Sequence, residues 1–110
     1  MLEVLHRSEP MLTVTVGNER RQDDSITEGW IQEQIGRRRA DGITPQITID
    51  ISSDRANITL SIPSYPGGGG RRPNELESQI FGLWRGLELD SPTFTANGFV
   101  AFIKGVRRLL

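Results

Sequence analysis

The sequence has no cysteine, a single histidine (His6) and a single lysine (Lys104). Without cysteine there is no disulfide framework, no thiolate nucleophile and no Cys-ligated zinc or iron–sulfur centre. A single imidazole near the start of the chain is a poor basis for a metal site or for acid–base catalysis. The carboxylate pairs Asp23-Asp24 and Glu75/Glu77 fall in a loop and at a helix start. We therefore expect a protein that is not an enzyme and that needs no cofactor and no metal.

Long apolar runs and an excess of one charge are also missing. No segment approaches the roughly 18 apolar residues of a membrane helix, and Glu3 and Arg7 interrupt "MLEVLH", which lacks the form of a secretory signal. The chain has 13 basic and 14 acidic residues. A strong global field for nucleic acid or an anionic membrane is therefore not expected. These features predict a cytoplasmic protein with no membrane contact.

The length of 110 residues suits one small domain covering residues 1–110. Within it, residues 1–10 are expected either to lack fixed structure or to add a strand. All basic residues except Lys104 are arginine, for which the codon bias of a GC-rich, bacterial genome is the simplest cause. Selection of arginine for binding phosphate is the alternative.

Three segments have the alternating pattern of half-buried strands. "LTVTV" (12–16) is the first, and Gly17-Asn18 ends it. "QITIDIS" (46–52) and "NITLSI" (57–62) pair as a hairpin around a four-residue loop, 53–56. This register places the aliphatic residues of both strands on one face and polar residues on the other, which is typical of an antiparallel sheet covered by helices on one side.

Three amphipathic helices are predicted around these strands. The first covers Ile26 to Ala40, with Ser25 and Glu28 as a capping box. The second begins after Asn74, which pairs with Glu77, and the third begins after Thr95. The expected fold class is α+β: a small three-stranded sheet in the order β-α-β-β-α-α, with the helices on one face. A right-handed crossover would make the first strand parallel to a neighbouring hairpin strand.

The second and third predicted helices each contain two glycines at helical spacing: Gly82 and Gly86 in the second, and Gly98 and Gly105 in the third. A glycine inside a helix costs about 1 kcal/mol relative to alanine. Their number therefore indicates a packing reason, such as the close crossing of two helix backbones. Weak, fraying helices are the alternative interpretation.

The segment "SYPGGGGRRPNELESQ" (64–79) resembles a phosphate-binding loop at first sight. It lacks the lysine and the hydroxyl that follow the glycines of a P-loop, and Glu75 and Glu77 place negative charge at the helix start where a phosphate would bind. We expect residues 64–73 to be a flexible connection, with weak density for Gly67 to Gly70.

Clustered arginines and an unusually apolar third helix give two hypotheses for function. The first is a small regulatory domain that binds a protein partner or forms a homodimer through the apolar third helix, and this hypothesis is preferred. Its candidate interface residues are Phe99, Phe102, Ile103 and Val106. The alternative is a nucleic-acid-binding accessory protein. Its candidate contacts are Arg37, Arg38, Arg39, Arg71 and Arg72.

The order strand, helix, hairpin, helix over residues 11–88 resembles that of the DNA-damage-inducible DinI proteins, small bacterial regulators that bind a recombinase. The resemblance implies an α+β fold and a protein partner. DinI proteins depend on an acidic final helix, whereas the last helix here ends in Lys104, Arg107 and Arg108. Their mode of binding therefore does not carry over to this chain.

Overall fold

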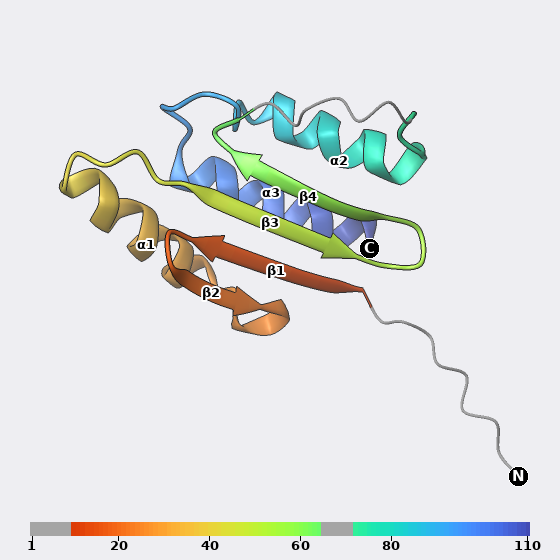
Figure 1. Cartoon of the computed structure of the whole chain (residues 1–110), viewed down its shortest axis with the longest axis horizontal. Helices are drawn as coiled ribbons and strands as arrows, with labels where there is room; N and C mark the ends of the chain where they lie inside the picture. The colour runs from red at the N-terminus through yellow and green to blue at the C-terminus, as the bar shows by residue number, and fades with distance from the viewer. Residues whose placement is uncertain (1–9, 65–71) are drawn as a thin grey trace, which may run out of the picture.

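Four antiparallel strands form one sheet in the order β2-β1-β3-β4 (Figure 1). The computed structural model describes residues 10–64 and 72–110. The strands are β1 (Met11–Val16), β2 (Glu19–Gln22), β3 (Ile47–Ser52) and β4 (Asn57–Ile62). The α+β class is confirmed, whereas the expected number of three strands is wrong because β2 was not foreseen.

Strand β2 also changes the direction of β1 relative to the second hairpin. β1 pairs antiparallel with both β2 and β3, so the prediction of a parallel neighbour for β1 is wrong. The physical reason is that β2 reverses the chain before the first helix, and the helix therefore connects β2 to β3. These two strands run parallel to each other on either side of β1. The added strand also interrupts the element order that resembles the DinI proteins.

The second hairpin has the predicted register. Ile51 pairs with Ile58, Ile49 with Leu60, and Ile47 with Ile62. The four-residue loop between the strands is closed by a hydrogen bond of 2.8 Å from the Ser53 backbone NH to the Ala56 carbonyl.

The helices are α1 (Glu28–Ala40), α2 (Glu75–Gly86) and α3 (Ala96–Leu109). The predicted start of the first helix is wrong by two residues. Ser25 ends a short 3-10 turn, η1 (Asp23–Ser25), and the hydroxyl of Thr27 instead accepts the Trp30 backbone NH at 3.1 Å. The predicted caps of the other helices are confirmed, because Asn74 accepts the Glu77 NH and Thr95 accepts the Gly98 NH, both at 2.8 Å.

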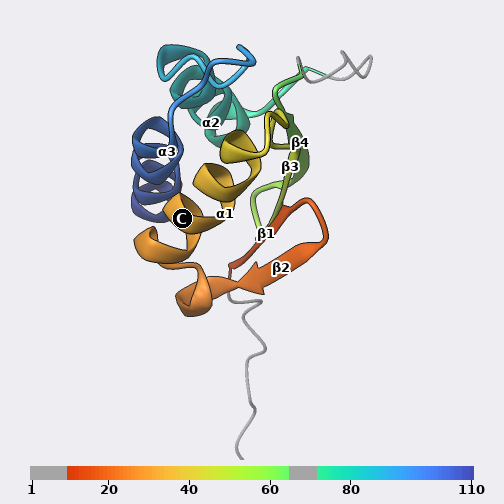
Figure 2. The ribbon, with the colours of Figure 1, turned by 90° about the vertical axis from the view of Figure 1, so that its left-hand side faces the viewer.

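All three helices lie on the same side of the sheet, and α3 packs against both α1 and α2 (Figure 2). The core fills the space between the sheet and the helices, and every residue in it that comes from β1 or β3 is aliphatic. The opposite face of the sheet has polar residues, among them Thr48, Asp50 and Thr59, and no helix covers it (Figure 2). In the ranges 10–64 and 72–110, no helix is long and apolar enough to cross a membrane.

Two predictions fall on residues that the structure does not describe. We expected either no fixed structure or an extra strand for residues 1–10, of which residues 1–9 lie outside the described residues, as do residues 65–71, which include Gly67 to Gly70.

Candidate functional site

The four residues predicted as a partner interface lie in the interior of the chain. Phe99, Phe102 and Val106 are 0% exposed and Ile103 is 2% exposed. The rings of Phe99 and Phe102 stack with their centroids 6.4 Å apart. The wide apolar surface of α3 is therefore used inside the domain, where α3 contacts both other helices. A partner cannot reach these side chains while the domain stays folded.

The three arginines at the end of α1 each contact another part of the chain. Arg37 pairs with Glu33 one turn earlier. The Arg38 guanidinium donates to the carbonyl oxygens of Gln34 (3.1 Å) and Val16 (3.0 Å), which ties α1 to the end of β1. Arg39 donates to the Phe94 carbonyl and lies 4.8 Å from the centroid of the Phe94 ring.

The remaining two candidate arginines precede α2. Arg72 is exposed, and Arg71 lies outside the described residues. The structure therefore does not place the five candidate arginines together on one surface.

Candidate metal ligands are also dispersed in the part of the chain that the structure describes. No group of three or more His, Asp or Glu side chains there could hold a metal ion. The Glu77 carboxylate is buried and accepts the Asn74 backbone NH at 3.0 Å. Asp23 accepts the Leu12 backbone NH at 3.0 Å. Both carboxylates thus have structural roles at the ends of elements.

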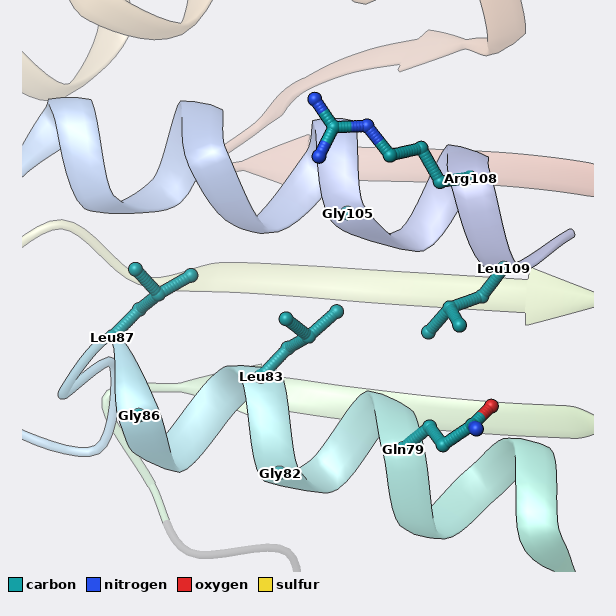
Figure 3. A pocket seen from close by; sticks show the side chains of 8 residues that line it. All are labelled: Gln79, Gly82, Leu83, Gly86, Leu87, Gly105, Arg108 and Leu109. Atoms are coloured by element: carbon teal, nitrogen blue, oxygen red, sulfur yellow. The ribbon is translucent and has the colours of Figure 1, made fainter.

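An apolar groove lies between α2 and α3 (Figure 3). We call it the α2–α3 groove. Its volume is about 580 Å³ and it is widely open to solvent. Leu83 of α2 and Leu87, which follows α2, reach toward α3, and Leu109 reaches from α3 toward α2, while the strands run behind the two helices (Figure 3). The lining residues are Gln79, Gly82, Leu83, Gly86, Leu87, Gly105, Arg108 and Leu109.

Of the two α3 glycines, Gly105 lies closest to α2. A Cβ atom on Gly105 would lie 2.8 Å from Leu83 Cδ1, whereas the nearest atom to a Cβ on Gly98 is Oγ1 of Thr95, the N-cap of α3 itself, at 2.9 Å. The predicted packing role therefore holds for Gly105, against a leucine side chain of α2.

The predicted packing role does not hold for Gly82 and Gly86, because nothing in the described chain lies within 4 Å of a Cβ at either position. These two glycines keep one wall of the α2–α3 groove bare.

The substitution Gly82→Ala is expected to raise the free energy of unfolding by about 1 kcal/mol, the difference in helix propensity between the two residues. The added methyl group meets no neighbouring atom. Urea denaturation followed by tryptophan fluorescence measures the change. A loss of stability would show that Gly82 is packed against something that the structure does not show.

Sequence reasoning singled out Gly82, Gly86 and Gly105 but interpreted them as packing residues, and it treated Arg108 as a helix-end cation. The available signal for the groove was the four-residue spacing of Gly82 and Gly86 beside Leu83 and Leu87. That spacing places all four residues on one side of α2.

The chain was compared with models of protein families, with curated proteins and with solved structures, and none of them matches it.

Proposed function

We propose that this protein is a non-enzymatic interaction domain that regulates a partner protein by docking it in the α2–α3 groove. The observation that carries the proposal is the groove itself: three leucine side chains, which are only partly buried, line an open hollow of about 580 Å³. Concave apolar surface between two helices can receive the apolar side chains of a partner.

The proposed docking site thus still includes α3, the helix expected to bind a partner, but it uses a different face of that helix. The face of α3 with Phe99, Phe102, Ile103 and Val106 is buried. Gly105, Arg108 and Leu109 form the part of α3 that borders the groove. The glycines of α2 support the same proposal, because each costs helix stability and a Cβ there would meet no neighbour among the residues that the structure describes.

The nucleic-acid alternative receives less support from the contacts. Each of the three arginines at the end of α1 is already held by a carboxylate or a carbonyl oxygen of the chain. Binding a phosphate would compete with these contacts, and the aromatic residues Trp30, Trp84, Phe99 and Phe102, which could stack on bases, are buried.

Selection of peptides from a displayed library tests the proposal. Sequences captured by the native protein are expected to be lost with Gly82→Leu, since the leucine side chain fills the groove. They are expected to be retained with Gly36→Leu, a matched control on α1, where the glycine is also exposed and nothing lies within 4 Å of a Cβ. Equal capture by both variants would place the docking surface elsewhere and contradict the proposal.

A further inference from the structure

We infer that the α2–α3 groove receives an amphipathic helix of a different protein, with acidic residues along the edge that faces α3. This inference rests on the proposed function and names the partner of the same site. Shape, symmetry and charge each contribute one step to it.

The open shape of the groove favours a helix over a small molecule. Pockets for small ligands usually enclose 70–90% of the ligand surface, whereas this groove is open to solvent on the side away from the sheet. An amphipathic helix buries only one stripe and leaves its polar face in water. Large side chains four residues apart on such a helix can reach the bare positions at Gly82 and Gly86.

A second copy of the chain fits poorly in the same groove. A two-fold dimer brings the same surface of both copies together, and none of the eight residues that line the groove is acidic. In such a dimer, the groove of the other copy would offer no carboxylate to Arg108. The occupant is therefore expected to be a different protein with protruding apolar residues.

The charge of the groove indicates which kind of partner helix it prefers. Arg108 is the one charged residue among the eight that line the groove. It is exposed, and its side chain lies along α3, with the guanidinium on the side of α3 away from α2 (Figure 3). The two neighbouring cations of α3 are directed elsewhere: Lys104 lies 3.7 Å from Glu28, and Arg107 donates to the carbonyl oxygens of Asp23 and Ile26.

Within residues 10–64 and 72–110, Arg108 has no hydrogen bond or ion pair. A carboxylate on the α3 side of a docked helix would give its guanidinium a partner. Charges at the rim of an interface add specificity and speed association, so an acidic helix is preferred over a basic one.

Two synthetic helical peptides of about 18 residues, or five turns, test this inference. Both have leucine at positions i, i+3, i+4 and i+7, and they differ only in having Glu or Lys along one edge of the leucine stripe. Fluorescence anisotropy at low salt is expected to show binding of the Glu peptide about tenfold tighter than that of the Lys peptide. Arg108→Glu is expected to reverse this order, while Arg20→Glu, an exposed charge reversal on β2, leaves it unchanged.

The outcomes separate this inference from the proposed function. If both peptides bind equally and Gly82→Leu abolishes the binding of both, the groove docks helices, but the inference of an acidic partner is wrong. If binding persists in Gly82→Leu, the assignment of the docking site to the groove is wrong. If neither peptide binds, the inference of a helical partner is wrong. A dimer in sedimentation that Gly82→Leu dissociates would show that the occupant is a second copy.

Discussion

Phe102→Ala is expected to lower the free energy of unfolding by about 3–5 kcal/mol, the range for removing a large aromatic side chain from a packed core. Phe102 is 0% exposed and stacks on Phe99. A small domain has a total stability of about 5–15 kcal/mol, so this variant loses a large share of it. Urea denaturation followed by fluorescence gives the change, and Phe102→Leu, which retains most of the volume, is expected to lose much less.

This prediction decides between the two roles considered for the apolar face of α3. A residue at a partner interface can be truncated while the monomer remains stable. If Phe102→Ala had a native unfolding midpoint and an altered sedimentation coefficient, the side chain would belong to an interface between chains, and the burial seen here would be contradicted.

Gly17→Ala is expected to have the second largest effect, a loss of about 3 kcal/mol. Gly17 has a φ of 62°, where a side chain costs about 1–2 kcal/mol. A Cβ there would also clash with the Arg38 guanidinium. Arg38 would have to move and would lose its 3.0 Å hydrogen bond to the Val16 carbonyl, which is worth a further 1–2 kcal/mol or so.

Gly42→Ala is the matched control. Gly42 has a φ of 74°, and nothing lies within 4 Å of a Cβ. Only the backbone strain applies, so a loss of about 1 kcal/mol is expected. Equal losses for Gly17→Ala and Gly42→Ala in urea denaturation would mean that the contact between Arg38 and the β1–β2 turn contributes nothing to stability.

The second hairpin was predictable because its apolar residues alternate strictly and only one register pairs them. Ile49 opposite Leu60 fixes the positions of Ile51 and Ile47, since a slip by one residue would turn every aliphatic side chain toward solvent. The caps of α2 and α3 were predictable because Asn74 and Thr95 satisfy backbone NH groups that have no other local partner.

Strand β2 was not predictable from periodicity because "ERRQ" contains no apolar residue and is exposed throughout. It lies at the edge of the sheet, where charged residues are common. The missed signal was Gly17-Asn18, a two-residue sequence that favours a hairpin turn and not only the end of a strand. Without β2, the direction of β1 could not be derived.

The interface residues predicted on α3 are buried, and the proposed groove uses a different face of that helix. An apolar surface wider than one stripe on α3 fits either an interface or burial between two other helices, and the sequence does not show how many neighbours the helix has. The structure gives α3 two helix neighbours, α1 and α2, and Phe102 and Val106 are buried. The groove depends on Gly82 and Gly86 remaining unpacked, a property of the assembled helices.

NMR chemical-shift changes of the backbone amides test the docking of a partner in the α2–α3 groove most directly. A peptide selected on the native protein is added to the isotope-labelled chain, and the shifted amides are located on the structure. The predicted result is a cluster at Gly82, Gly86 and Gly105, with unchanged amides at Thr48 and Thr59 on the uncovered face of the sheet. Shifts concentrated on that face, or at Arg37 to Arg39, with none in the groove, would contradict the account.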